Sequence, residues 1–313
     1  MYALYRPPFP AVVDNTMLNT FRGCPRKAEL SYIEHWKYKG KSVHLHAGAA
    51  WAHGLEAIRQ AFFDNGQSQD DSIALGVRAL LDFYGSFECP PESAKSAERL
   101  VEALDYYFEA FPLETDAARP IKLPSGKHAI EFSFAEPLDF LNPETGDPVI
   151  YCGRSDFIAE LNNGLYIADD KTTSALGSSW YNQWEMRGQF TGYCWAGHRI
   201  GFQVDGVLVR GIAILKTKFN HAQHITYRPQ WEIDRWYAQT LRDLKRLQDM
   251  WERGEYDYNL GETCAEYGGC QFSRVCKSPE PMEWLPAYFE RRRWDPLTRT
   301  EMLLEEWNDP PSY

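Results

Sequence analysis

The sequence predicts an α/β protein with one central mixed β-sheet flanked by helices. Helical patterns fill the first third of the 313-residue chain, strand patterns follow, and helix, strand and helix then alternate. This order is typical of an α/β domain, because helices bury the faces of a sheet that lies between them. The length and the 44% hydrophobic content are enough for a full core, and we expect one domain over 1–313.

The N-terminal region, residues 1–110, is expected to be mainly helical. Its first helix has Asp14 or Asn15 as the N-cap and apolar residues such as Leu18 and Phe21 at helical spacing. The helices that we expect in this region are 14–37, 46–64, 70–86 and 93–110.

The sheet is expected within residues 125–220, and a long helix and loops within 225–313. A strand pattern at 129–134 precedes a stretch rich in Pro, Asn and Gly, which predicts turns. The elements that we expect are a strand at 129–134, turns at 137–148, a helix at 180–200, a strand at 207–217 and a helix at 229–253.

The most informative segment is a β-hairpin predicted within residues 153–172. Two short apolar runs flank Asn162-Asn163-Gly164, residue types that tolerate the positive φ angles of a tight hairpin turn. The first strand carries Asp156, and the second ends in Asp-Asp-Lys. Pairing across the turn would bring Asp156 and Asp169 to one end of the sheet, with Lys171 on the same face as Asp169.

Two carboxylates and an amine at one strand end suit a divalent cation and the phosphate that it activates. Carboxylates hold Mg²⁺ or Mn²⁺, which polarise a scissile phosphate and lower the pKa of bound water. Lys171 could orient that water or neutralise charge developing on the phosphoryl oxygen. A single Asp at a strand end is commonly only a turn residue, so the argument depends on Asp156, Asp169 and Lys171 together.

Three further side chains are candidates for the same site. His53 and Glu56 share a helical face, and an imidazole ligand would favour Mn²⁺ over Mg²⁺. A histidine satisfied within the core is the alternative, and His44 and the other histidines are not assigned. Gln189 and Tyr193, four residues apart on a predicted helix, could contact a phosphate or a base, although ordinary packing of Tyr193 is equally open.

The seven cysteines favour metal ligation or buried thiols over disulfides, since we expect a cytoplasmic protein. Cys264, Cys270 and Cys276 are evenly spaced in a Gly-containing loop and are one ligand short of a tetrahedral thiolate site. Cys24 is the natural fourth ligand. The local spacing leaves the metal open, with zinc as the generic occupant.

Composition and charge set further limits. The sequence has no apolar run of membrane-spanning length and no signal-peptide layout, so we expect no membrane partner. The net charge of −11 argues mildly against a large nucleic-acid surface. A basic stretch over 22–41, interleaved with Trp36 and Tyr38, could nevertheless follow a phosphate backbone, or could be a solvated helix face. Gly40-Lys41-Ser42 lacks the leading Gly of a phosphate-binding loop, because His35 stands there.

In order and identity these residues resemble the PD-(D/E)XK nucleases of the RecB-like exonuclease group. The similarity is to the iron–sulfur subgroup, which includes the CRISPR adaptation exonuclease and phage-encoded homologues. The motifs that carry it are Cys24-Pro25, Gly48…His53…Glu56, Glu131, Gly153…Asp156, Asp169-Asp170-Lys171-Thr172, Gln189…Tyr193 and Cys264…Cys270…Cys276.

The resemblance implies a restriction-endonuclease-like core closed by a C-terminal iron–sulfur clasp. It implies the following site residues: His53, Asp156, Asp169 and the backbone carbonyl of Asp170 as metal ligands, Lys171 as catalytic, Gln189 and Tyr193 as accessory, and Cys24, Cys264, Cys270 and Cys276 as ligands of a 4Fe-4S cluster. Two features depart from the family pattern. Asp169 stands where Glu is commoner, and five residues separate each pair of C-terminal cysteines, where many members have two in the first gap.

The function that the resemblance implies is a Mn²⁺- or Mg²⁺-dependent DNA exonuclease in recombination, repair or end processing. Its substrate would be single- or double-stranded DNA with ends, and helicase or recombination proteins would act in trans. The oligomeric state stays open, and a phage-encoded protein would act in the host cytoplasm. Two alternatives remain: a catalytically inactive DNA-binding accessory module of the same fold, and a zinc-stabilised structural or interaction protein.

Overall fold

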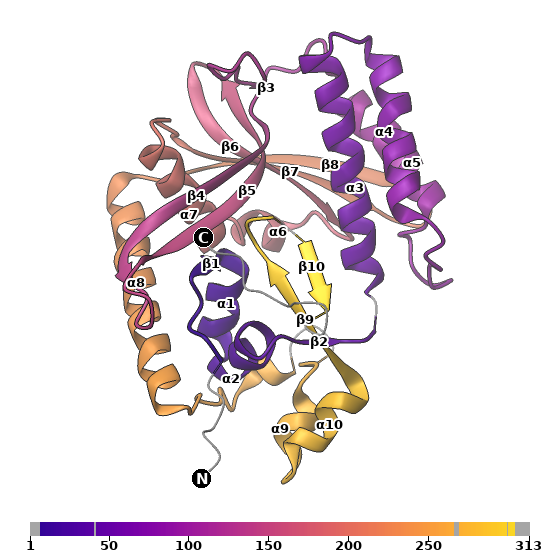
Figure 1. Cartoon of the computed structure of the whole chain (residues 1–313). Helices are drawn as coiled ribbons and strands as arrows, with labels where there is room; N and C mark the ends of the chain where they lie inside the picture. The colour runs from indigo at the N-terminus through magenta and orange to yellow at the C-terminus, as the bar shows by residue number, and fades with distance from the viewer. Residues whose placement is uncertain (1–6, 41, 266–268, 299, 304–313) are drawn as a thin grey trace. The chain divides into compact units, whose positions relative to one another are not determined.

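The computed structural model describes residues 7–40, 42–265, 269–298 and 300–303, which form two compact units (Figure 1). The first unit comprises Met1–Gly40, Phe134–Gly153 and Asp234–Tyr313, and the second comprises Lys41–Ser133 and Arg154–Ile233. The two units interleave along the sequence, so the region 125–220 contributes to both. None of the helices in the described ranges combines the length and the apolar character needed to cross a membrane.

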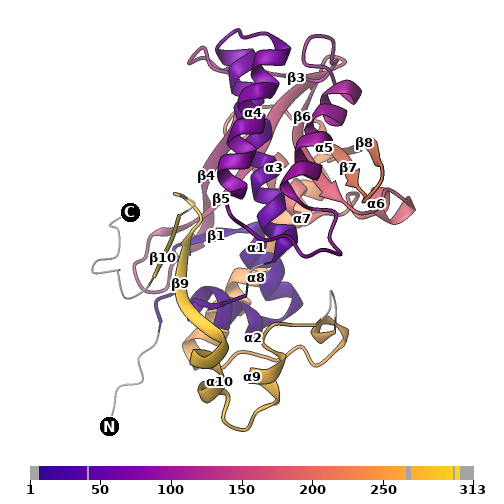
Figure 2. The same ribbon diagram turned by 90° about the vertical axis from the view of Figure 1, so that its right-hand side faces the viewer.

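Three helices of the second unit pack side by side (Figure 2): α3 (Val43–Arg59), α4 (Gln69–Tyr84) and α5 (Ala97–Ala110). Each follows a serine whose side chain accepts a hydrogen bond from a backbone N–H of the first turn, which satisfies a donor with no partner inside the helix. A π-helical turn, Gln60–Asp64, extends α3. These elements confirm the helices predicted at 46–64, 70–86 and 93–110.

The sheet of the second unit is mixed, which confirms the predicted α/β class. The strands in question are β3 (Arg119–Pro120), β5 (Pro148–Leu161), β6 (Gly164–Thr173), β7 (Gly206–Ile214) and β8 (Phe219–Tyr227). β5 is antiparallel to β3 and β6, β6 is parallel to β7, and β7 is antiparallel to β8. β8 was not predicted, because only Ala222 and Thr226 within it are buried and its pattern is otherwise polar.

Helices cover both faces of this sheet. Ile212 and Ile214 of β7 pack into the core formed by α3, α4 and α5. On the other face lie α6 (Ser178–Asn182) and α7 (Gly188–Arg199), into which the helix predicted at 180–200 divides. The ring of Trp180 approaches Gly211 so closely that a Cβ there would lie 2.3 Å from a ring carbon. Any larger residue at position 211 would therefore displace α6.

The hairpin turn has the predicted geometry. Asn162 and Asn163 have φ angles of 51° and 66°, and Leu161 pairs with Gly164 across the turn. Two positive φ angles in succession are typical of a type I′ turn, whose twist matches that of the strands. The turn thereby sets the register of β5 against β6.

The first unit begins with β1 (Val12–Asp14), which runs parallel to the start of β5. Asp14 caps α1 (Asn15–Gly23) by accepting a hydrogen bond of 2.7 Å from the Met17 N–H. The helix predicted at 14–37 was wrong beyond this point. Cys24 is extended because it precedes Pro25. The chain continues as α2 (Pro25–Ala28), a π-helical turn (Glu29–Ile33) and β2 (Trp36–Tyr38).

The C-terminal part of this unit is more ordered than the loops predicted there. The elements are α8 (Gln230–Arg253), a 3₁₀ turn (Glu262–Cys264), α9 (Ser273–Lys277), α10 (Pro281–Tyr288), β9 (Phe289–Asp295) and β10 (Thr300–Leu303). β9 pairs with β2 on one side and with β10 on the other. Phe272, Leu285 and Phe289 pack with Leu30 in one apolar cluster.

Two further predictions need correction. The turns expected over 137–148 begin later, because β4 (Ile130–Leu141) continues to residue 141 and the turn follows Asn142. The basic stretch over 22–41 is not one stripe. Arg22 pairs with Asp243 and Arg26 with Glu29, whereas Lys37 of β2 and Lys39 just after it are exposed. Lys41 lies outside the described residues.

Candidate functional site

Asp156 lies where the backbone pairing between β5 and β6 ends. The ladder runs from the turn to the pair Phe157–Ala168. Beyond this pair, the backbone N–H of Asp170 donates a hydrogen bond of 2.6 Å to Oδ2 of Asp156. The carboxylate of Asp156 thus takes the place of a backbone acceptor, and it lies beside Asp169 as the hairpin register predicts.

Lys171 contacts Asp169, one of these two carboxylates. Its Nζ forms an ion pair with Oδ1 of Asp169, which is 3% exposed. Residues 169 and 171 share a face of β6, since side chains alternate along a strand. Burial alone would lower the pKa of Lys171, but Asp169 and Asp156 together outweigh burial and raise it. The amine is therefore protonated at neutral pH.

The carboxylates at this site disfavour one another's charge. Burial raises the pKa of Asp156, and the nearby charges of Asp169, Asp170 and Glu131 raise it further. Burial likewise raises the pKa of Asp169, against the opposing effect of Lys171. A site in which carboxylates repel one another gains from a bound cation, because opposite charge favours their ionised forms.

Glu131 approaches the same site from β4. Its Oε2 lies 2.5 Å from Nε of Arg154, and its φ of 49° places it in the left-handed region. Such a backbone costs energy for a residue with a side chain, and strained residues concentrate at functional sites. Glu131 and Asp156 also line one pocket, so the structure brings this residue of the motif set to the site.

A pocket of about 290 Å³ opens beside these side chains. The sheet and β4 supply its polar wall, and α3 supplies the opposite wall. The lining residues are His44, Leu45, Gly48, Trp51, Ala52, Leu55, Glu131, Asp156, Asp170, Lys171 and Thr172. All belong to the second unit. A carboxylate-rich pocket with one lysine can hold a cation and a phosphate together.

The structure does not bring His53 to the carboxylates. Its side chain is 49% exposed, stacks on Phe83 of α4 with ring centroids 4.5 Å apart, and lies 4.0 Å from Glu56. Ala52 and Leu55 line the pocket, and a step of about 100° per residue turns His53 to another face of α3. The histidine that lines the pocket is His44, which lies nine residues earlier on another face of the same helix.

Gln189 and Tyr193 lie together on α7, where Gln189 Nε2 donates a hydrogen bond of 3.1 Å to the Tyr193 hydroxyl. Tyr193 is buried, and burial raises its pKa to about 12, with Asp169 and Asp156 adding to the rise. Those electrostatic effects show that Tyr193 lies near the carboxylates. Its phenol stays protonated and can act as a hydrogen-bond donor there.

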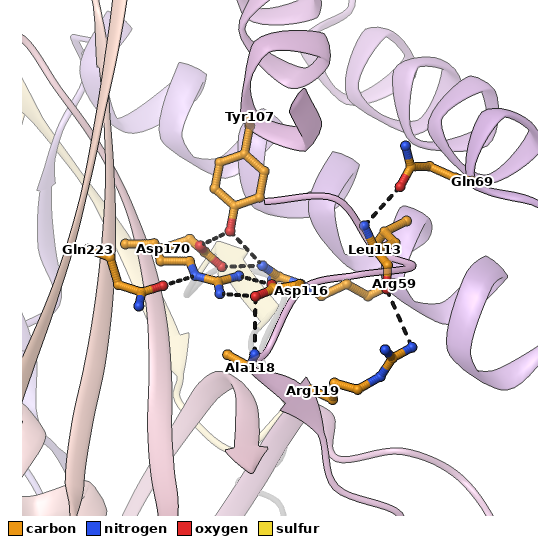
Figure 3. A network of polar contacts seen from close by, with 10 residues as sticks. Arg59, Gln69, Tyr107, Leu113, Asp116, Ala118, Arg119, Asp170 and Gln223 are labelled. Atoms are coloured by element: carbon orange, nitrogen blue, oxygen red, sulfur yellow. Dashed lines mark hydrogen bonds and ion pairs between the residues drawn. The ribbon is translucent and has the colours of Figure 1, made fainter. Parts of the chain in front are cut away.

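A buried network behind the site was not predicted from the sequence (Figure 3). Asp170, expected to offer its backbone carbonyl, also has a buried carboxylate, which Arg59 contacts at 2.6 Å and the Tyr107 hydroxyl at 2.5 Å. Arg59 lies four residues after Leu55 on the buried face of α3. A charged residue within an otherwise apolar helical stripe is the signal that could have indicated a buried ion pair.

The four predicted cluster ligands lie in one neighbourhood of the first unit. Burial raises the pKa of the Cys276 thiol, and the nearby Cys270, Cys24 and Cys264 contribute to that rise. Cys264 and Cys276 are exposed, and Cys24 and Cys270 are half-buried. Asn259 Nδ2 donates a hydrogen bond of 2.5 Å to the carbonyl of Gly23, which ties the N-terminal turn to the cysteine loop.

Within the described ranges, no three His, Cys, Asp or Glu side chains are arranged to hold a metal ion by themselves. Asp156 and Asp169 still fit Mg²⁺ or Mn²⁺ by donor type, because such ions are commonly held by one or two carboxylates with water completing the shell. Four neighbouring thiols fit a thiolate-bound metal by donor type, although their sulfurs do not converge here.

Comparison with known proteins gives one family match. A family model described as the PD-(D/E)XK nuclease superfamily matches residues 15–277. The crystal structure of a "Putative exonuclease" from Eubacterium rectale is similar, with a TM-score of 0.48 and 13% identity over 82% of this chain and 86% of that one. The structure of a protein named SSO0001 has a TM-score of 0.31 and 14% identity over 72% of this chain and 84% of that one. No curated protein matches the sequence.

Proposed function

Because this chain belongs to the PD-(D/E)XK nuclease superfamily, we propose that it is a metal-dependent DNA nuclease with its active site at Asp156, Asp169 and Lys171. One observation carries the proposal. Asp156 and Asp169 come together at the end of the β5–β6 ladder, and Lys171 contacts Asp169 on the same face. A protein without chemistry at this position would gain nothing from gathering carboxylates that repel one another.

Each side chain has a role that its environment supports. Asp156 and Asp169 would hold Mn²⁺ or Mg²⁺, with the carbonyl of Asp170 as a further donor. The bound ion would polarise the scissile phosphate and activate the attacking water. Lys171, protonated beside Asp169, would offset charge that develops on the phosphoryl oxygens. Tyr193 would donate a hydrogen bond to the DNA backbone, since its phenol keeps its proton.

The ligand set that we propose differs from the one that the motif order implies. His53 faces away from the carboxylates, and His44 lines the pocket on the same helix. We therefore leave His53 out of the proposed metal site. Asp169 instead of Glu keeps a carboxylate at the same strand position.

We propose that the enzyme degrades DNA from an end, in recombination, repair or end processing. The resemblance of its motif order to RecB-like exonucleases supports this mode. Linear and covalently closed circular duplexes of equal sequence test it directly, together with a circular single strand. Cleavage of the linear form alone supports an exonuclease, whereas equal loss of the closed circles would show an endonuclease.

We also propose that Cys24, Cys264, Cys270 and Cys276 ligate a 4Fe-4S cluster in the first unit. The shared neighbourhood of the four thiols supports this, and the ties from Gly23 to Asn259 and from Arg26 to Asp257 would hold the N-terminal ligand near the loop. A cluster at this point would have a structural role, because it would link segments more than 200 residues apart in sequence.

The experiment that tests the proposed function uses protein purified without oxygen. Mn²⁺-dependent cleavage of end-labelled DNA is measured for the wild type and for Asp169→Asn. Cleavage by the wild type that the variant has lost supports the assignment. DNA binding without metal-dependent cleavage by the wild type would instead favour a catalytically inactive accessory module, and absence of DNA binding at any salt concentration would favour a structural protein.

A further inference from the structure

Asp170 is held from two directions at once. Its backbone N–H donates to Asp156 at 2.6 Å, within the proposed metal site. Its carboxylate points to the other side of β6, where Nη2 of Arg59 lies 2.6 Å from Oδ2 and the Tyr107 hydroxyl donates to Oδ1 at 2.5 Å (Figure 3). The side chain of Asp170 and that of Arg59 are 3% and 4% exposed.

The buried ion pair between Arg59 and Asp170 has further charged and aromatic neighbours. Arg210 of β7 lies directly beside Asp170 in the parallel ladder, and its guanidinium forms two hydrogen bonds to Asp116, of 2.6 and 2.8 Å. Two cations and two anions thus alternate within the core. The Arg59 guanidinium also stacks on the ring of Phe157, 4.4 Å from its centroid. The Arg210 guanidinium lies over the ring of Phe111, 4.3 Å from its centroid, so both guanidiniums have a ring contact as well as a charged partner.

Such an arrangement is seldom a gain in stability. Burial of paired charges commonly contributes little beyond what apolar residues of similar volume would contribute. The network instead fixes the orientation of Asp170. Each oxygen of its carboxylate has its own donor, and the two donors come from the last turns of α3 and α5. Residue 170 cannot rotate without breaking both contacts, so its N–H stays directed at Asp156.

We propose that Arg59 and Tyr107 are positioning residues of the nuclease site, which act on the metal-binding carboxylate of Asp156 through the backbone of Asp170. The inference rests on the proposed function, because it assigns Asp156 to the ion. Neither Arg59 nor Tyr107 lines the pocket beside Asp156. Their effect passes through two hydrogen bonds in series, from the Arg59 and Tyr107 side chains to the Asp170 carboxylate and from the Asp170 N–H to Asp156.

The test compares Tyr107→Phe and Arg59→Lys with the wild type. Tyr107→Phe removes one oxygen and keeps the ring, and Arg59→Lys keeps the charge but loses the planar fork. Gln69→Ala is the matched control, because Gln69 belongs to the same layer and accepts a hydrogen bond from the Leu113 N–H without contacting Asp170. Asp156→Asn serves as the reference for loss of the ion.

Two readouts that need no catalysis are measured below each variant's melting temperature. The first is Mn²⁺ affinity without DNA, which we expect to fall roughly 10-fold in both positioning variants, as for outer-shell partners of metal ligands. The second is hydrogen exchange of the Asp170 amide, which should quicken in both. Gln69→Ala should change only the melting temperature. Cleavage assays should show a lower kcat and an unchanged KM for DNA.

The outcomes separate the two claims. If the wild type binds Mn²⁺ and Asp156→Asn does not, while both positioning variants bind and exchange like the wild type, then the inference is wrong and the proposed function stands. If the wild type binds no Mn²⁺ and cleaves no DNA, both fail. If Arg59→Lys does not fold, Tyr107→Phe alone decides.

Discussion

Lys171 and Asp169, two residues apart on β6, form an ion pair on one face of the strand. Asp169 is buried, so removal of the lysine leaves a buried carboxylate without its closest cation. Breaking one half of such a pair destabilises a protein more than deleting both halves does. Changes at position 171 therefore affect both stability and chemistry, and any test of the site has to measure the two separately.

The two histidines of α3 give a direct comparison. We expect His53→Ala to cleave DNA within about twofold of the wild type, because His53 packs on Phe83 away from the pocket. His44→Ala should lower cleavage by roughly 10-fold, since His44 lines the pocket and can donate to a phosphate. Initial rates at saturating Mn²⁺ measure both. If His53→Ala loses most of its cleavage activity and His44→Ala cleaves like the wild type, His53 is a metal ligand, as the motif order implies.

A buried lysine outside the site predicts a pH-dependent stability. Lys95 is 5% exposed, and its amine has no hydrogen-bond partner among the described residues. Burial lowers its pKa from 10.5 to about 8. Because the folded state resists protonation, the free energy of unfolding should rise between pH 8 and pH 10.5 and show the full penalty below pH 8.

Lys95→Met should remove that penalty and stabilise the protein at pH 7 by up to about 3 kcal/mol. Its free energy of unfolding should also rise less steeply between pH 8 and pH 10.5 than that of the wild type. Lys127→Met, at an exposed position, is the control and should change stability little. Denaturant titrations at several pH values measure all three proteins. A Lys95→Met variant less stable than the wild type at pH 7 would show that the amine has a favourable partner.

The cysteine neighbourhood predicts a coloured protein. Purified without oxygen, the wild type should be brown, contain iron and lose visible absorbance on reduction. Cys24→Ser should lose the iron and be less stable, because Cys24 would be the ligand from the N-terminal turn. Cys89→Ser, a control in the second unit, should keep the iron and the stability of the wild type. If the wild-type protein is colourless and contains stoichiometric zinc, the four cysteines hold a structural zinc ion and the cluster proposal is wrong. The nuclease proposal does not depend on this result.

What could be predicted from the sequence was local. The turn at Asn162 and Asn163 follows from residue types that accept positive φ, and the turn fixes the register that brings Asp156 to Asp169. Strand alternation then places Lys171. These steps require no knowledge of contacts between residues distant in sequence, so the proximity of Asp156, Asp169 and Lys171 could be predicted.

The remainder depends on partners distant in sequence. Arg59 and Asp170 are 111 residues apart, and no local pattern pairs them. β9 carries three successive arginines and lacks apolar alternation, and it forms a strand because it pairs with β2 some 250 residues earlier. His53 was assigned from its place in the motif order, whereas the helical phase of the pocket residues selects His44. The break at Cys24 had a local signal in Pro25, which a helix pattern spanning 14–37 obscured.

The most direct test of the central claim measures Mn²⁺-dependent cleavage by Asp169→Asn and Lys171→Met, with the melting temperature and DNA affinity of each. Both variants should bind DNA and unfold cooperatively while cleavage falls by roughly 10²-fold or more. Folded variants of both kinds that cleave at the rate of the wild type would contradict a catalytic site at Asp156, Asp169 and Lys171.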